Sequence, residues 1–233
     1  ITTGVEAIES QTYQNSTDPH AWMDARNGLI YIENIKNALV QLDPDNTDKY
    51  VFNYNYYRQQ IEDLNHYIQT EIAKIPTEQR IIITSHDAFQ YYGRAYGLRL
   101  EAVLGTSTDA EVQVSDIKRL TEVIRNSGIP AVFVETTVNP QLLQQIAADN
   151  NITIGGKLYS DSLGDKDSPA STYLDMLTYN TRTIVQALAR PARSPKVTED
   201  TTSQEESGSS IPLYAALGVL LIGSLLFVAR KMG

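Results

Sequence analysis

The chain contains few imidazole or thiol side chains that could bind a metal ion, and two of its histidines occur at positions typical of binding sites. It has three histidines, His20, His66 and His86, and no cysteine. A metal site in this chain must therefore use nitrogen and oxygen ligands. His20 lies in the run Asp-Pro-His-Ala-Trp at a predicted helix start, and His86 follows an isoleucine-rich predicted strand. An imidazole and a carboxylate that converge from two parts of the chain would form a site for a divalent metal ion.

Two carboxylates follow other predicted strands. Glu135 ends the apolar run Ala-Val-Phe-Val, and Asp161 follows a glycine pair and the run Lys-Leu-Tyr-Ser. Each candidate also has a structural alternative: a histidine at a helix start can be a capping or surface residue, Asp161 can cap a turn, and Glu135 can pair with a neighbouring base. The acidic cluster that begins at Asp161 lacks the glycine and glutamate positions of an EF-hand loop, so no calcium site of that type is expected. His66 lies off the apolar stripe of its helix and is predicted to be solvated.

The elements that would position these residues alternate between short apolar runs and helical stretches. Predicted strands cover 81–83, 100–103, 131–134 and 152–154, and predicted helices cover 87–97, 112–127, 140–149 and 169–190. Four strand–helix units in succession predict an α/β fold with a four-strand parallel doubly wound sheet. Ligands bind outside the carboxyl ends of such strands, so His86, Glu135 and Asp161 are expected at one edge.

Two predicted helices precede this sheet. Apolar side chains recur every three or four residues over 22–42, and His20 lies at the start of that helix. Asp43-Pro44 then ends it and begins a second helix, with Asp as N-cap and Pro in the first turn. The apolar stripe continues to Ile75, so this helix is predicted over 44–75 with a length of about 50 Å. A helix of this length can link two lobes rigidly.

The charge balance and the C-terminal segments indicate location and partners. The 28 acidic and 19 basic residues give a formal net charge of -9, which argues against binding to nucleic acid. Residues 191–210 are rich in Ser, Thr, Glu and Pro and are predicted to form a flexible stalk. Residues 211–229 carry no charge and would span about 28 Å, close to the roughly 30 Å hydrocarbon core of a membrane. Because Arg230 and Lys231 follow, we expect a single-pass membrane protein anchored by a helix over 211–230, with the head outside the cell and a short cytoplasmic C-terminus.

Four runs carry a resemblance to a known family: DPHAWMD, TSHDAFQYYGRAYGL, AVFVETTV and GGKLYSDSLGDKDSPASTY. In order and spacing they resemble the zinc/manganese solute-binding proteins of ABC metal importers, the cluster with a rigid helix between two lobes. The resemblance extends over residues 1–190. It implies a two-lobed fold in which 1–43 belong to the N-terminal lobe, 44–75 form the linking helix and 76–190 form the C-terminal lobe.

The same resemblance implies the roles of the candidate site residues. His20, His86 and Asp161 would be the metal ligands, and Glu135 would orient the ligands by hydrogen bonding. The imidazole at position 86 favours zinc, because members that prefer manganese often have a carboxylate there and zinc binds nitrogen-rich sites more tightly. Manganese is the alternative. The implied partners are an ABC permease and its ATPase subunit.

The sequence departs from the family at its beginning. The family has a first lobe of several strands before the DPHAW motif, and that lobe supplies another histidine ligand. Only residues 1–17 precede the motif here. We therefore expect an N-terminally truncated chain in which 1–43 is a remnant of the first lobe. The histidine-rich loop that is common in zinc-specific members is also absent from the sequence.

The expected function is a transport receptor that captures a divalent metal ion and delivers it to the permease. Metal binding would order the loop around Asp161, and the permease would recognise that ordered surface. An enzyme is not expected, because the sequence contains no HExxH, GxSxG or phosphate-binding glycine loop. A metal-dependent hydrolase with Glu135 as general base is the enzymatic alternative. A surface adhesion or interaction protein with a structural or vestigial metal site is a further alternative.

Overall fold

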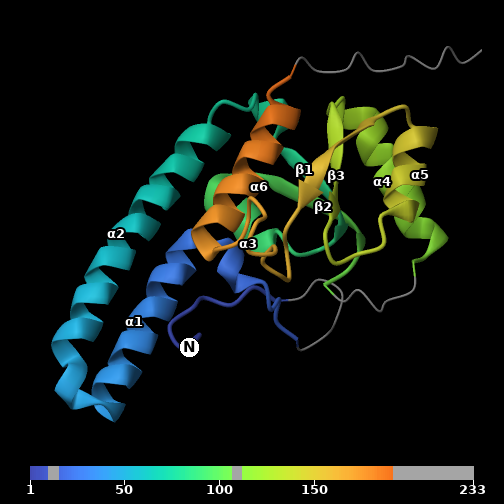
Figure 1. Ribbon diagram of the computed structural model, residues 1–233. Coiled ribbons are helices and arrows are strands. Elements are labelled where there is room, and N and C mark those ends of the chain that lie inside the picture. The colour runs from blue at the N-terminus through green and yellow to red at the C-terminus, as the bar shows by residue number, and fades with distance from the viewer. Residues whose placement is uncertain (10–15, 107–111, 191–233) are drawn as a thin grey trace, which may run out of the picture. The chain divides into compact units, whose positions relative to one another are not determined.

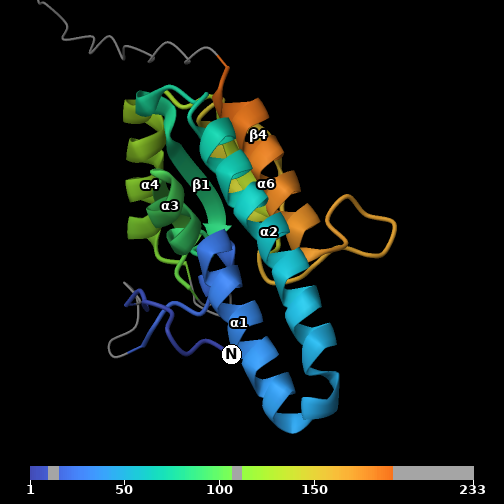
Figure 2. The same ribbon diagram turned by 90° about the vertical axis from the view of Figure 1, so that its left-hand side faces the viewer.

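The computed structural model describes residues 1–9, 16–106 and 112–190. Its two longest helices are α1 (Ala25–Leu42) and α2 (Thr47–Ile72). They pack against each other as a hairpin, and the end of the hairpin extends beyond an α/β part that follows in the chain (Figures 1 and 2). The predicted pair of helices before the sheet is therefore present.

Each helix of the hairpin begins later than the sequence predicts. Before α1, the element η1 (Ala21–Met23) forms a separate 3-10 turn, and the carboxylate of Asp24 caps α1 by accepting a backbone N–H. Before α2, the turn η2 (Pro44–Asn46) takes the proline, whose ring has no N–H to donate. Because α2 has 26 residues, it is about 39 Å long, shorter than the predicted helix over 44–75.

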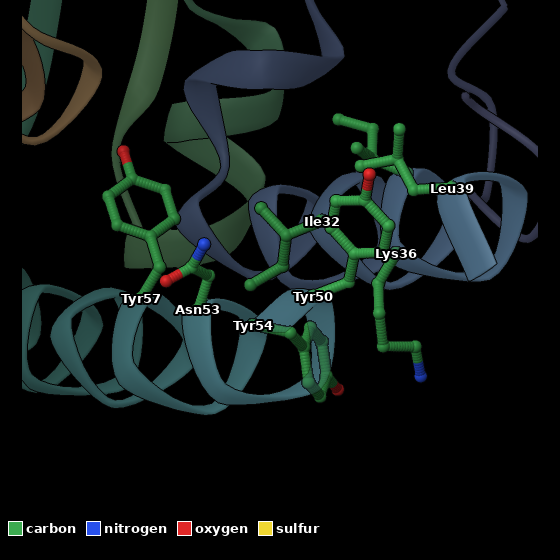
Figure 3. Close-up of a pocket in the computed structure, with 8 residues that line it drawn as sticks. Ile32, Lys36, Leu39, Tyr50, Asn53, Tyr54 and Tyr57 are labelled. Carbon is green, nitrogen blue, oxygen red and sulfur yellow. The ribbon is translucent and has the colours of Figure 1, made fainter. Parts of the chain in front are cut away.

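The two halves of α2 have different surroundings. The N-terminal half faces α1 across an apolar groove of about 340 Å³ (Figure 3). The groove is lined by aliphatic and aromatic side chains with one lysine and one asparagine: Ile32, Ile35, Lys36, Leu39, Tyr50, Asn53, Tyr54 and Tyr57. The C-terminal half instead buries its apolar stripe, which consists of Ile61, Leu64, Ile68 and Ile72. Only this second half of α2 behaves as a core helix.

Four parallel strands follow the hairpin, in two pairs. They are β1 (Ile81–His86), β2 (Arg99–Leu104), β3 (Ala131–Glu135) and β4 (Thr153–Leu158). β1 pairs with β2, β3 pairs with β4, and β1 lies beside β3. The described residues thus form two two-stranded sheets instead of the predicted single four-strand sheet. At the boundary, the backbone N–H of His86 donates to the carboxylate of Glu135. In a continuous sheet, this N–H would instead donate to a backbone carbonyl of the neighbouring strand.

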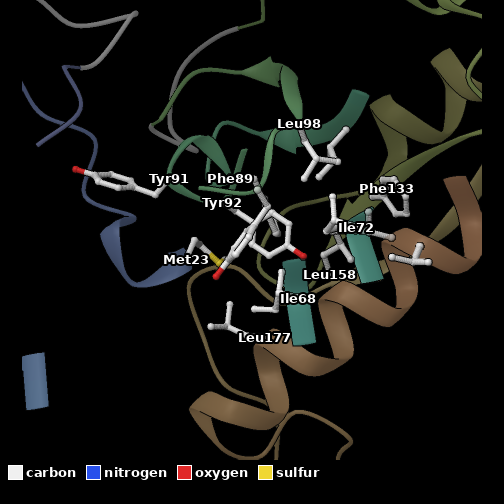
Figure 4. Packing of buried hydrophobic residues seen from close by; sticks show 14 of the residues in the cluster. Met23, Ile68, Ile72, Phe89, Tyr91, Tyr92, Leu98, Phe133, Leu158 and Leu177 are labelled. Carbon is white, nitrogen blue, oxygen red and sulfur yellow. The ribbon is translucent and has the colours of Figure 1, made fainter. Parts of the chain in front are cut away.

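Helices cover both faces of these strands. The helices are α3 (Gln90–Tyr96), α4 (Val114–Ser127), α5 (Gln141–Asp149) and α6 (Tyr173–Leu188), and a short turn, η3 (Thr77–Gln79), precedes β1. Phe133 points into an apolar cluster with α2, α3 and α6 (Figure 4), and Ile82 belongs to the same cluster. Ile83 and Val132 belong to a second cluster with α4 and α5. Successive strand residues therefore serve opposite faces, as the predicted α/β fold requires.

The last strand is longer than predicted. The sequence predicts a strand over 152–154, but β4 continues through Gly155 and Gly156. A Cβ atom on Gly155 would lie 2.7 Å from the Ala187 Cβ and 2.9 Å from the Ala131 Cβ. The glycine therefore belongs to a strand that α6 approaches closely, and it does not mark a turn.

Some predictions on organisation are not tested by the fold. The lobe boundaries at residues 43 and 75 stay predictions. The predicted stalk over 191–210 and the predicted membrane helix over 211–230 lie outside the described residues. In the part of the chain that the structure describes, no helix is long and apolar enough to cross a membrane.

Candidate metal centre

The three residues that the sequence predicts as ligands lie together. His20 precedes η1, His86 is the last residue of β1, and Asp161 lies in the loop between β4 and α6. One possible ligand atom from each residue lies within 4.8 Å of the other two. The two imidazole rings have centroids 5.3 Å apart and planes inclined by 71°. Elements from distant parts of the sequence thus present two imidazoles and one carboxylate to the same point.

His20 is oriented by Asp18, two residues before it. The Oδ1 atom of Asp18 accepts the backbone N–H of His20 at 2.8 Å and lies 2.7 Å from its Nδ1. Both residues are buried. This contact leaves the Nε2 atom of His20 directed at Asp161. Sequence reasoning did not identify Asp18 as a site residue, although the spacing Asp-x-His was a usable signal, because an aspartate often bonds the backbone two residues on.

His86 is oriented by Glu135, the last residue of β3. The Oε1 atom of Glu135 accepts the backbone N–H of His86 at 2.9 Å, and its Oε2 lies 2.7 Å from the His86 Nδ1. Glu135 and His86 are each only 1% exposed. The structure thus places Glu135 behind the imidazole, on the side away from Asp161.

Asp161 lies between the two rings. Its Oδ1 is 3.2 Å from the Nε2 of His20, and its Oδ2 is 3.2 Å from the Nε2 of His86. The hydroxyls of Thr137 and Ser160 donate to Oδ2 at 3.0 and 3.3 Å. The side chain of Asp161 is 31% exposed, against 4% for His20 and 1% for His86. Asp161 is therefore the outermost of the three groups, and Thr137 is a further contact that the sequence did not reveal.

The histidines and the aspartate stabilise each other's charges. Burial by itself lowers the pKa of His20, but the carboxylates of Asp161 and Asp18 outweigh burial and raise this pKa to about 9. The same balance, with Asp161 and Glu135 as the carboxylates, raises the pKa of His86 to about 9. Burial opposes ionisation of Asp161, yet the contacts with His20 and His86 hold the pKa of its carboxyl well below the ordinary value. A metal ion that binds here must therefore displace protons.

Residues next to the site residues in the sequence carry buried polar atoms. Several buried oxygen atoms have no hydrogen-bond partner among the described residues: Asp18 Oδ2, Ser85 Oγ, Asp87 Oδ1 and Thr136 Oγ1. Each belongs to a residue one or two positions from His20, His86 or Glu135. Burial raises the pKa of Asp87. Asp87 is close enough to His20 and His86 for their charges to act on its carboxyl, so a further buried carboxyl group lies near the two imidazoles.

His66 takes no part in this arrangement. It is exposed on α2 and is not among the three residues whose ligand atoms converge. The sequence-based prediction that it is a solvated surface residue is confirmed.

Comparisons with known proteins point to one family. The family model described as "Zinc-uptake complex component A periplasmic" matches residues 1–187. The manganese-binding lipoprotein MntA of Halalkalibacterium halodurans is 37% identical over 173 residues, which cover 74% of this chain and 58% of that protein. The zinc-binding protein TroA of Treponema pallidum is 35% identical over 178 residues, with the same two coverages. The chain thus spans less than two thirds of the length of these curated relatives.

Solved structures agree with this result. The periplasmic zinc-binding protein TroA from Treponema pallidum superposes with a TM-score of 0.73 at 31% identity, covering 78% of this chain and 68% of that one. The manganese-bound periplasmic metal-binding protein from Candidatus Liberibacter asiaticus superposes with a TM-score of 0.73 at 33% identity, covering 81% and 70%. The fold is therefore that of periplasmic metal-binding proteins.

The comparisons contradict the predicted single-pass location. The relatives from Halalkalibacterium halodurans and Streptococcus pneumoniae are named as lipoproteins, a class that is held at the membrane by attached lipid. Among the described residues no helix has the length and apolarity of a membrane span, and the predicted span over 211–230 lies outside those residues. The prediction of a single-pass membrane protein is therefore wrong.

The motif-based resemblance is confirmed by these findings. The family match covers most of the chain, and relatives above 30% identity cover 74% of it. Another relative, SsaB of Streptococcus sanguinis, is named as a metal ABC transporter substrate-binding lipoprotein. The chain belongs to the zinc-uptake complex component A family.

Proposed function

We propose that the chain binds a divalent transition-metal ion between His20, His86 and Asp161 as the substrate-binding component of an ABC importer. It would deliver the ion to a membrane permease that works with an ATPase subunit. The observation that carries the proposal is the convergence of two imidazoles and one carboxylate, with ligand atoms within 4.8 Å of one another. Relatives named as manganese-binding and zinc-binding proteins support the same role.

The groups behind the histidines support metal binding. Asp18 and Glu135 each lie 2.7 Å from an Nδ1 atom, so both rings direct their Nε2 atoms toward Asp161. A carboxylate behind a ligating histidine fixes the ring and makes the imidazole a stronger ligand. On metal binding, Asp161 would exchange its contacts with two protonated rings for a bond to the ion.

Zinc is the ion that this donor set favours, and manganese is the alternative. Zinc accepts imidazole nitrogen and carboxylate oxygen in sites of four ligands. At a site with two nitrogen donors, zinc also has the higher intrinsic affinity of the two metals. We therefore propose zinc as the substrate.

The surroundings of Glu135 favour capture over catalysis. A general base needs a carboxylate oxygen within reach of the substrate. One oxygen of Glu135 accepts the His86 backbone N–H, and the other lies 2.7 Å from the imidazole of the same residue. We infer that Glu135 orients His86, which leaves the hydrolase alternative without a base.

The test is a competitive titration of zinc and manganese on the 233-residue chain and on a His86→Ala variant. We expect wild-type protein to bind zinc and zinc to displace manganese. Loss of a direct ligand should weaken zinc binding by more than about 100-fold, beyond the range for groups that only orient ligands. His66→Ala removes an exposed histidine from α2 and should bind like wild type.

The other outcomes are informative. Equal zinc affinity in wild type and His86→Ala would exclude this site. A preference for manganese would keep the transport role and change the substrate. No metal binding, with a melting temperature that a chelator leaves unchanged, would favour the surface-interaction alternative.

A further inference from the structure

The single tryptophan of the chain joins the two sides of the metal centre. Trp22 lies in η1, two residues after His20, and is half-buried. Its indole Nε1–H donates to the backbone carbonyl of Ser160 at 2.9 Å. Its ring also meets the His20 imidazole edge-on, with centroids 5.4 Å apart. One side chain therefore contacts a predicted ligand and the residue that precedes another.

The backbone of Trp22 makes a second connection to the same loop. The hydroxyl of Tyr173 donates to the Trp22 carbonyl oxygen at 2.9 Å. Tyr173 is the first residue of α6, and Ser160 lies two residues after the end of β4. The loop that carries Asp161 is thus attached to Trp22 near both of its ends.

The other contacts of this loop explain why the attachment matters. Asp161 is the most exposed of the three predicted ligands, so it is the group that can move most easily. Its Oδ2 is held by the hydroxyls of Thr137 and Ser160. The Ser160 backbone that positions the adjacent Asp161 is held in turn by the indole of Trp22.

We propose that Trp22 is a positioning residue that holds the Asp161 loop closed over the bound ion. This inference rests on the proposed function. Trp22 does not touch the ion; it acts through Ser160 on Asp161. Opening of the Trp22–Ser160 hydrogen bond precedes release of the ion, so this bond sets the residence time of the metal and leaves the histidine side of the site unchanged.

The first experiment uses Trp22→Phe in the zinc-loaded 233-residue chain. Phenylalanine keeps an aromatic ring beside His20 but removes the N–H donor. Loss of one hydrogen bond should raise the rate of zinc dissociation into excess chromogenic chelator by about two- to tenfold, with an unchanged association rate. Tyr173→Phe removes the other attachment and should act in the same direction. Tyr56→Phe, on an exposed aromatic residue of α2, is the control and should have no effect.

A double-mutant cycle separates positioning from a purely structural role. If Trp22 acts through Asp161, Trp22→Phe should have no further effect on affinity in an Asp161→Asn background. The melting temperature of the metal-free protein should change little in Trp22→Phe. An equal loss of affinity in both backgrounds, or unchanged dissociation in both Trp22→Phe and Tyr173→Phe, would overturn the inference. Failure of the wild type to bind zinc would instead refute the proposed function, and this inference with it.

Discussion

The two histidines of the candidate metal centre are held by the same kind of contact, which is built in different ways. In each case a carboxylate accepts the backbone N–H of the histidine and lies 2.7 Å from its Nδ1. Asp18 is two residues from His20 and uses one oxygen for both contacts. Glu135 is 49 residues from His86 and uses a different oxygen for each. The His20 side is therefore a local turn, whereas the His86 side requires β1 and β3 to dock.

This difference shows which side of the site should couple folding to metal binding. The described residues form two sheets, and Glu135 connects the end of β3 to the end of β1 at their boundary. Weakening the contacts of Glu135 should thus disturb the packing of the two sheets against each other as well as the orientation of His86. The side-chain hydrogen bonds of Asp18 instead stay within its own turn: its Oδ1 contacts His20, and its Oδ2 is buried without a hydrogen-bond partner in the described part of the chain.

The largest expected effect is that of pH, which tests whether the two sides behave alike. Both histidines have a pKa of about 9, raised from 6.5. The stability that they contribute to the metal-free fold is therefore fully present below pH 6.5 and is lost as pH rises to about 9. Zinc affinity should rise over the same interval, by about tenfold per pH unit for each proton displaced.

Calorimetry in buffers of different ionisation enthalpy would count these protons at pH 7. Release of two protons per zinc ion would show that the two sides are equivalent. Release of one would show that only one histidine is protonated, and an affinity that does not change with pH would contradict the charge pairing described above.

The next effect compares Glu135→Gln with Asp18→Asn. Each change removes one negative charge and places an amide behind an imidazole. We expect zinc affinity to fall by about 100-fold in Glu135→Gln and by about tenfold in Asp18→Asn, the two ends of the range for groups that orient ligands. Only Glu135→Gln should also lower the melting temperature of the metal-free protein clearly. Equal losses in affinity and stability would show that the distance between partners in the sequence does not matter.

The smallest expected effect on zinc dissociation is that of a change at Gly28, a residue of α1 that lies against the side chain of Tyr173. A Cβ atom at this position would lie 2.8 Å from the Tyr173 hydroxyl oxygen, so the tyrosine must shift, and we expect its bond to Trp22 to weaken. Gly28→Ala should therefore speed zinc dissociation by about two- to fivefold, less than a fully lost hydrogen bond. Asn37→Ala, at an exposed position of the same helix, controls for the higher helix propensity of alanine. Identical dissociation rates in both variants would show that Tyr173 adapts without cost.

Much of the site could be predicted because its residues lie at the ends of recognisable elements. His86 and Glu135 end apolar strands. His20 and Asp161 could be assigned because the order of the motifs indicates the family resemblance. Thr137 was missed because one polar residue among several in a loop has no periodic signal, and its role depends on which side chains the fold brings within hydrogen-bond distance. Asp18 was missed although its spacing of two residues from His20 was a usable local signal.

The fold was predicted in its class and not in its details. Periodicity indicated helices and strands alternating after residue 76, and the structure contains them. The division into two sheets could not be predicted, because it depends on the hydrogen bonds along the boundary of β1 and β3, where the His86 N–H donates to the Glu135 side chain. The extent of β4 was missed because Gly155 and Gly156 suggest a turn, whereas close packing by α6 explains the first of them.

The position of Asp161 between two imidazoles has a consequence for recognition by a partner. With both rings protonated and Asp161 ionised, the three side chains carry a net charge of one positive unit, by the directions of their pKa shifts. A divalent ion that displaces both protons leaves that net charge the same. Loading is then an electroneutral exchange, so the electrostatic field that a distant partner experiences changes little. If the chain delivers metal to a permease, as we propose, the permease must therefore recognise the loaded protein by the shape of the surface around Asp161.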